Sequence, residues 1–106
     1  MTPHVSDIQA AVCQQYHIAP IEMTSRRNGR ALARPRQVAM YLVRELTPLS
    51  TPEIGKAFAR DHTTVLHAIR TIEAIMARDR QFASAIAVLR YRIAYPGQHP
   101  LPLDQA

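Results

Sequence analysis

Four consecutive side chains in the middle of the chain can donate or accept hydrogen bonds: Asp61, His62, Thr63 and Thr64. Asp61 is a favourable helix N-cap, because its carboxylate can accept the first unpaired backbone N–H groups of a helix. The apolar residues that follow recur at spacings of four, three and four, as on one face of a helix: Val65, Ile69, Ile72 and Met76. A helix that begins in this way has the size and the chemistry to lie in a groove and bind hydrogen-bonding edges.

The polar face of this predicted helix carries Thr63, His67 and Arg70. Short donors and acceptors, in place of Lys and Glu pairs, are unusual on a face that only meets solvent. His67 allows two interpretations: a polar side chain of that face, or a partly buried histidine between two helices. We predict that the helix ends near Arg78 and Asp79.

A shorter helix is predicted immediately before it. Its start allows two interpretations: a capping box of Ser50 and Glu53, or a Thr51 cap with Pro52 at the first helical position. Gly55 permits the close approach of another backbone, and residues 59–61 separate the two helices. A short helix, a tight turn and a longer helix form the helix-turn-helix arrangement, whose second helix enters the DNA major groove.

The segment that precedes this arrangement is basic, since residues 23–44 contain six arginines and no acidic residue. Pro35 is predicted to start a helix that runs to about Leu46, with Met40 opposite its apolar arc and Arg36 at the border. A charge run is often only a solvated face. Unbroken positive charge beside a helix-turn-helix instead favours contact with phosphates, because the release of counterions rewards that arrangement.

The remaining helices follow from the same periodicity. Apolar residues mark one amphipathic helix from Val5 to about Tyr16 and a last one from Phe82 to about Tyr95. Residues 21–23 are expected to add a single turn. The fold class is therefore all-α, a helix-turn-helix domain of five or six helices.

The composition limits the chain to one small domain, because 106 residues, 47% of them hydrophobic, suffice for a single helical core. We expect residues 1–4 to be a flexible lead-in, residues 5–95 to form the domain and residues 96–106 to be a disordered tail. The formal net charge of +5 suggests a polyanionic partner. Cys13, the only cysteine, is expected to be a buried structural residue.

Several classes of function are excluded by the pattern. The five histidines and the single cysteine lack zinc-ligand spacing, and no Gly-rich phosphate loop is present. We therefore predict no metal, no cofactor and no enzymatic activity. No apolar run reaches the length of a membrane span, and the start of the chain has no signal-peptide pattern. The expected location is the cytoplasm, in association with the nucleoid.

Three blocks of sequence closely resemble the C-terminal DNA-binding domain of the bacterial chromosomal replication initiator DnaA. They read ARPRQVAMYL at residues 33–42, PEIG at residues 52–55 and RDHTTVLHA at residues 60–68. The resemblance runs from about Val5 to Met76, with matching order and nearly matching spacing. It implies double-stranded DNA as the partner and binding at sites like the initiator's box.

The resemblance also implies roles for individual residues. Base contacts are expected from Asp61, His62, Thr63 and Pro52. Backbone contacts are expected from Arg36, Gln37, Arg44, Thr64 and Arg30. In the family, an arginine of the preceding loop enters the minor groove, but the matching position here holds Asn28, flanked by Arg27 and Arg30. Either arginine takes over this contact, or minor-groove binding is reduced.

Two further expectations rest on differences from the family. The family tends to have two glycines where this chain has only Ala59 between Phe58 and Arg60, so a tighter turn is expected. The initiator's ATPase module is missing, and the Met1 start with a long C-terminal extension favours a small natural protein over an excised domain. We predict a replication or transcription regulator without ATPase activity. The alternative is a protein-interaction adaptor that docks on replication proteins or forms a homodimer through its last helix.

Overall fold

The structure, a computed structural model, describes residues 2–97. Its elements follow in the order α1 (Val5–Tyr16), the 3-10 turn η1 (Pro20–Met23), α2 (Arg30–Leu46), α3 (Thr51–Phe58), α4 (His62–Arg78) and α5 (Arg80–Ala94). The all-α class predicted from the sequence is confirmed, because no strand occurs among residues 2–97. No helix in that range is long and apolar enough to cross a bilayer.

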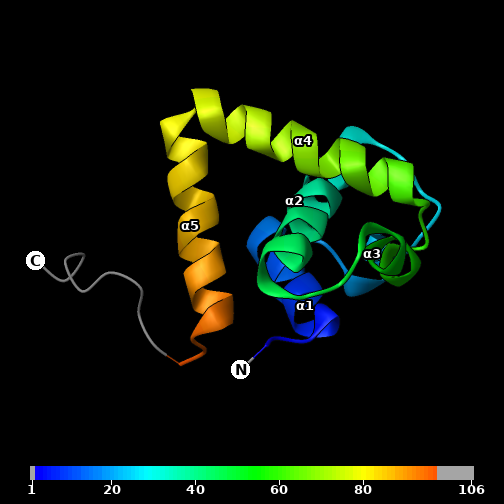
Figure 1. Ribbon diagram of the computed structural model, residues 1–106, viewed down its shortest axis with the longest axis horizontal. Helices are drawn as coiled ribbons and strands as arrows, with labels where there is room; N and C mark the ends of the chain where they lie inside the picture. The colour runs from blue at the N-terminus through cyan, green and yellow to red at the C-terminus, as the bar shows by residue number, and fades with distance from the viewer. Residues whose placement is uncertain (1, 98–106) are drawn as a thin grey trace, which may run out of the picture.

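Helix α2 lies at the centre of the fold, and the other helices surround it (Figure 1). It packs against α1, η1, α3, α4 and α5. Every α-helix adds apolar side chains to one core, among them Ile8, Val38, Phe58, Val65 and Ile86. Because α2 has neighbours on most of its sides, all of residues 38–43 are buried. The expectation that Met40 faces away from the core is therefore wrong.

The start of α2 also differs from the sequence prediction, because the helix begins at Arg30 and not at Pro35. The carbonyl of Gly29 accepts hydrogen bonds from the amides of Leu32 and Ala33, both at 3.1 Å. Burial of the Leu32 side chain stabilises this additional turn. Pro35 lacks an N–H, so a helix that contains it loses one backbone hydrogen bond. The missing hydrogen bond lies near the start of α2, and the helix continues past Pro35 to Leu46.

The turn between α3 and α4 is tight, as expected from the sequence. Ala59 ends α3 in the left-handed conformation, with φ of 55°. The amide of Arg60 donates to the carbonyl of Gly55 at 2.8 Å. A Cβ atom at Gly55 would overlap the carbonyl oxygen of Arg60, so this position requires glycine for the close approach.

The first helix and the residues after it agree with the sequence prediction. Helix α1 ends at His17, which adopts the left-handed conformation, and η1 supplies the additional turn. Cys13 is buried, and burial raises the pKa of its thiol. The sequence predicted a disordered tail at residues 96–106; all of it except residues 96 and 97 lies outside the described residues.

Candidate nucleic-acid interface

The first turn of α4 is organised by Asp61. Its Oδ1 accepts the amide of Thr64 at 3.0 Å, and the hydroxyls of Thr63 and Thr64 also donate to that oxygen. Hydrogen bonds from the Thr63 hydroxyl and the Thr64 amide lower the pKa of Asp61. The predicted N-cap is thus confirmed. All three bonds end on Oδ1, so none of them uses the second carboxylate oxygen.

Exposed polar side chains cluster beside this cap. His62, Thr63 and Thr64 are exposed, whereas Val65, one residue further on, is fully buried. The hydroxyl of Thr63 is held by Asp61, and this restrains its rotamer and with it the orientation of its methyl group. The first turn of α4 therefore presents a preorganised set of donors, acceptors and one methyl group to solvent.

His67 lies one turn further along α4 and is exposed. Its Nε2 lies 3.5 Å from the hydroxyl oxygen of Thr71 on the same helix. The interpretation of His67 as a partly buried histidine between helices is therefore wrong. Helices α2 and α3 pack against the opposite, apolar side of α4, which leaves the His67 side facing solvent.

The start of α3 carries the predicted capping box. The Ser50 amide donates to Glu53 Oε1 at 2.9 Å, and the Glu53 amide donates to the Ser50 hydroxyl at 3.3 Å. The hydrogen bond from the Ser50 amide to its carboxylate is the main cause that lowers the pKa of Glu53. Pro52 is exposed in the first turn. Its fixed ring is thus an apolar contact surface on a rigid helix end.

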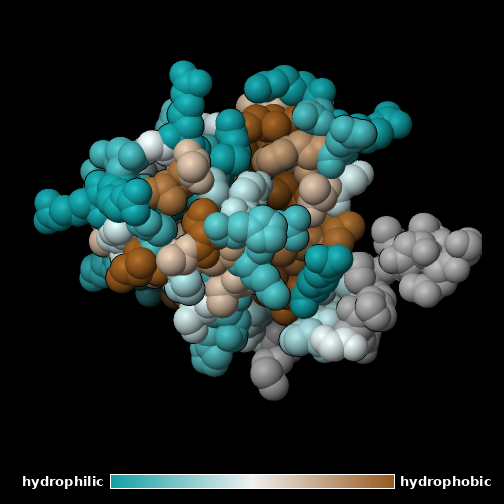
Figure 2. All heavy atoms as spheres, turned by 180° about the vertical axis from the view of Figure 1, so that it is seen from behind, coloured by the Kyte–Doolittle hydropathy of each residue, from teal (hydrophilic) through white to brown (hydrophobic). Residues whose placement is uncertain are grey.

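Residues 24–29, which we call the basic loop, pass the start of α4 on their way into α2 (Figure 1). Arg26, Arg27 and Asn28 are exposed. Arg27 Nη1 donates to Glu22 Oε2 at 2.7 Å. Seen from behind, the edge of the molecule with the basic loop and the start of α4 carries mostly hydrophilic side chains (Figure 2).

A polar stripe follows α2 from its first residue. Arg30, Gln37 and Arg44 are spaced by seven residues, or about two helical turns, so they share one edge of the helix. Arg30 and Arg44 are exposed and Gln37 is half-buried. Arg34 Nη1 donates to the side-chain oxygen of Gln37 at 3.0 Å. This edge holds three of the residues expected to contact the DNA backbone.

Arg36 occupies a different environment from the rest of that set. Its side chain points inward and the residue is only 6% exposed. Its Nε donates to the Glu22 carbonyl at 2.7 Å, and its Nη2 donates to the carbonyl and the hydroxyl of Ser25 at 3.3 and 3.0 Å. Burial is the main cause that lowers the pKa of Arg36. The Nε and Nη2 atoms of Arg36 thus have protein partners, and the expected phosphate contact of Arg36 stays a prediction.

Arg60 is a residue whose role the sequence reasoning missed. Its Nη2 donates to the carbonyl of Ser25 at 2.8 Å, across 35 positions of the chain. Its Nη1 donates to the carbonyls of Phe58 and Ala59 at 3.1 and 3.3 Å. A basic residue after a helix end was a usable signal, because the last carbonyls of a helix lack intrahelical partners.

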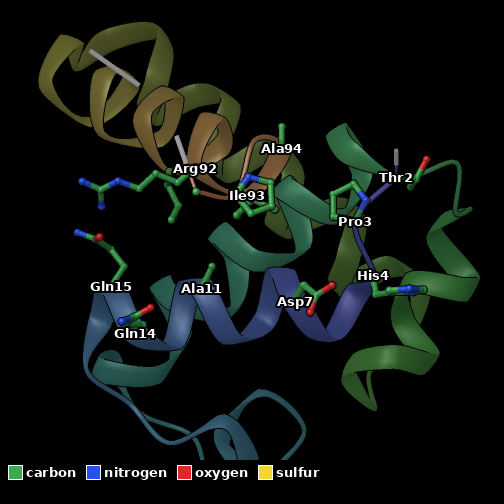
Figure 3. A pocket seen from close by; sticks show the side chains of 13 residues that line it. Thr2, Pro3, His4, Asp7, Ala11, Gln14, Gln15, Arg92, Ile93 and Ala94 are labelled. Atoms are coloured by element: carbon green, nitrogen blue, oxygen red, sulfur yellow. The ribbon is translucent and has the colours of Figure 1, made fainter. Parts of the chain in front are cut away.

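A groove runs along α1 and the residues before it, opposite the second half of α5 (Figure 3). Its volume is about 740 Å³, and Pro3, Ala11 and Ile93 contribute apolar walls. Gln14 and Arg92 lie at its edge.

Within residues 2–97, no group of three or more His, Cys, Asp or Glu side chains is placed to hold a metal ion.

A capped short helix, a three-residue turn and a longer helix with an exposed polar first turn define a helix-turn-helix domain of the DNA-binding class. Residues 5–72 match the family described as "Bacterial dnaA protein helix-turn-helix". The chain belongs to this family, and the resemblance of its three sequence blocks is confirmed.

Individual relatives match most of this chain, but the match covers only a small part of each relative's own length. The chromosomal replication initiator protein DnaA of Sphingopyxis alaskensis is 53% identical over 87 residues, which cover 81% of this chain and 19% of that protein. The DnaA protein of Zymomonas mobilis is 52% identical over 86 residues, or 80% and 18%. A crystal structure of a DNA replication initiation factor matches with a TM-score of 0.76 and 32% identity, covering 84% of this chain and 27% of that one. The chain thus spans about a fifth of the length of these curated relatives.

Proposed function

We propose that this chain binds double-stranded DNA at sites like the box of the initiator family, and that it regulates replication or transcription without hydrolysing ATP. The observation that carries the proposal is the first turn of α4. There, exposed donors and acceptors are held by Asp61 on a helix whose other face is buried in the core. This is the helix end that a helix-turn-helix directs at base edges.

In this proposal, the contacts with the DNA bases come from this turn and from the start of α3. The unused carboxylate oxygen of Asp61 accepts a hydrogen bond from the amino group of a cytosine, and the Thr63 methyl packs on a thymine methyl. His62 adds a ring nitrogen that binds a base edge. Pro52 supplies an apolar contact at the rim of the groove.

Binding to the sugar–phosphate backbone falls to the edge of α2. Arg30, Gln37 and Arg44 bind successive phosphates, and Thr64 binds one beside the start of α4. The basic loop enters the adjacent minor groove with Asn28 and with Arg27 or Arg30. Arg27 must first leave Glu22, with which it forms an ion pair at 2.7 Å.

Family membership favours this reading over a protein-interaction adaptor. As a regulator, the chain occupies or marks sites that a full-length initiator also binds. Neither a homodimer nor a replication protein is required for that role, since one helix-turn-helix contacts one site.

The test compares a duplex that contains an initiator-type box with a scrambled duplex of the same composition. His62→Ala and Thr63→Ala should each lower the affinity for the box by about 1–3 kcal/mol, the usual worth of a base contact, with little change on the scrambled duplex. Ser84→Ala, a hydroxyl deletion at an exposed position of α5, is the matched control. Equal binding of the parent chain to both duplexes would refute sequence-specific recognition, and unchanged box affinity of Thr63→Ala would exclude α4 as the reading helix.

A further inference from the structure

Two arginines join the basic loop to the start of α4 through a single carbonyl group. We propose that Arg36 and Arg60 are positioning residues that lock the basic loop to α4, so that minor-groove and major-groove contacts are made in one fixed register. The inference rests on the proposed function. It assigns to Arg36 a role inside the protein and to Arg60 a role in specificity.

The first half of the lock is Arg36, which anchors the beginning of the basic loop to α2. Its Nε and Nη2 reach the carbonyls of Glu22 and Ser25 at 2.7 and 3.3 Å, and Nη2 also reaches the Ser25 hydroxyl. Because the residue is only 6% exposed, these are shielded, charge-assisted hydrogen bonds.

The second half of the lock is Arg60, which lies directly before α4, the proposed recognition helix. Its backbone amide is bonded to the carbonyl of Gly55, and it directly precedes the N-cap Asp61. Its side chain bonds to the carbonyls at the end of α3 and, at 2.8 Å, to the carbonyl of Ser25. The carbonyl of Ser25 therefore joins α2, the basic loop and the start of α4 at one point.

The convergence of two guanidinium groups on one carbonyl needs compensation, because like charges repel. The charge of Arg60 indeed acts to lower the pKa of Arg36, and the charge of Glu22 acts to raise it. The carboxylate of Glu22 also accepts from the Ser25 hydroxyl at 2.6 Å and from Arg27 at 2.7 Å. Glu22 thus offsets part of the positive charge of this cluster and orients Ser25 and Arg27, which lead to Asn28.

The functional consequence is rigidity between two contacts to DNA. Asn28 lies three residues beyond Ser25, and His62 lies two residues beyond Arg60. With the lock closed, the loop is anchored to α4 at Ser25, so less ordering of the loop is needed upon binding. Preorganisation of this kind raises affinity because it removes an entropic cost of association.

Methylation protection by dimethyl sulfate separates the two contacts, because guanine N7 lies in the major groove and adenine N3 in the minor groove. In Arg60→Ala, we expect protection of guanine N7 to persist at saturating protein, while protection of adenine N3 at the AT-rich end is lost. Affinity for the box should fall about tenfold, the equivalent of one lost base contact. Arg60→Lys keeps the charge, but a single ammonium group cannot bind the Ser25 carbonyl and the carbonyls of Phe58 and Ala59 together. It should therefore behave like Arg60→Ala, with an unchanged salt dependence.

The control is Arg78→Ala, which removes one charge from the exposed far end of α4 and should leave both protections intact. Thermal melts of each variant verify folding. Parallel loss of both protections in Arg60→Ala and Arg60→Lys, or retained adenine protection, would overturn the lock. If the parent chain protects guanine but not adenine, the proposed lock is refuted and the proposed function still holds. If the parent chain protects neither base, the proposed function itself is refuted.

Discussion

At the scale of single residues, Asp61 orders the side chains on which recognition depends before any DNA is bound. One of its oxygens accepts the Thr64 amide and two threonine hydroxyls, so the cap and the candidate base contacts form one hydrogen-bonded unit. A cap of this kind stabilises its helix, because it satisfies a backbone N–H that has no partner within the helix. The same carboxylate therefore serves both the helix and the proposed recognition.

Asn28 provides a test of the minor-groove contact at this scale. Asn28 is a neutral, exposed side chain of the basic loop, and its neighbour Arg27 is paired with Glu22, whereas Arg26 and Arg30 are exposed. The resemblance to the family implies an arginine at the position of Asn28. Narrow minor grooves of AT-rich DNA attract a cation. Asn28→Arg should therefore tighten binding to a box with an AT-rich flank, on the order of tenfold.

The measurement is a titration of duplexes whose AT-rich flank is either kept or replaced by GC pairs. Asn28→Gln, similar in length but neutral, is the control for added bulk. Equal affinities of Asn28→Arg and the parent chain would show that Arg27 or Arg30 already occupies the groove, or that the loop stays outside it.

At the scale of elements, the turn between α3 and α4 fixes the angle of the recognition helix. Gly55 lets the backbone of Arg60 approach α3, and Ala59 takes the left-handed conformation that L-residues with a side chain adopt only with strain. The geometry of this three-residue turn rests on these two positions.

Substitutions at these two positions should change the stability of the fold in opposite directions. Gly55→Ala places a methyl group against the backbone carbonyl of Arg60, and this overlap outweighs the gain in helix propensity, so stability should fall by about 1–2 kcal/mol. Ala59→Gly removes the strain of the left-handed residue and should raise stability by about 0.5–1 kcal/mol. Thermal melts should differ by several degrees in opposite directions. A Gly55→Ala variant that melts at or above the parent temperature would contradict the close approach.

At the scale of the whole molecule, six of the thirteen basic residues lie in residues 23–44, a stretch without an acidic residue that forms the basic loop and most of α2. The chain carries a net charge of +5, and all six of these residues are arginines. Five of these arginines are exposed or half-buried, and Arg36 alone is buried. The interior arginine organises the interface, and the outer ones remain available for phosphates.

The salt dependence of binding tests this division. Arg44→Ala should weaken binding to specific and unrelated duplexes alike and flatten the slope of log K against log salt by about 0.9, the value for one lost phosphate contact. Arg92→Ala, a charge deletion at an exposed position near the end of α5, should leave the slope unchanged. Identical slopes for the parent chain and Arg44→Ala would remove Arg44 from the interface.

What the sequence by itself determined are the features that depend on near neighbours along the chain. The caps at Ser50 and Asp61, the apolar stripe of α4 and the close approach at Gly55 follow from interactions within a few residues, and all of them hold in the structure. The family also follows from such local blocks of sequence, because each block contains its own spacing.

Only the tertiary structure decided which polar side chains face solvent. Helix α2 is surrounded on most sides, so it buries Met40 and Arg36, which periodicity placed at the edge or outside. His67 is exposed because α2 and α3 both meet the opposite side of α4. Arg60 and Ser25 meet across 35 positions of the chain. Periodicity within one helix carries no record of how many neighbours that helix has, and for this reason these features became visible only in the packed molecule.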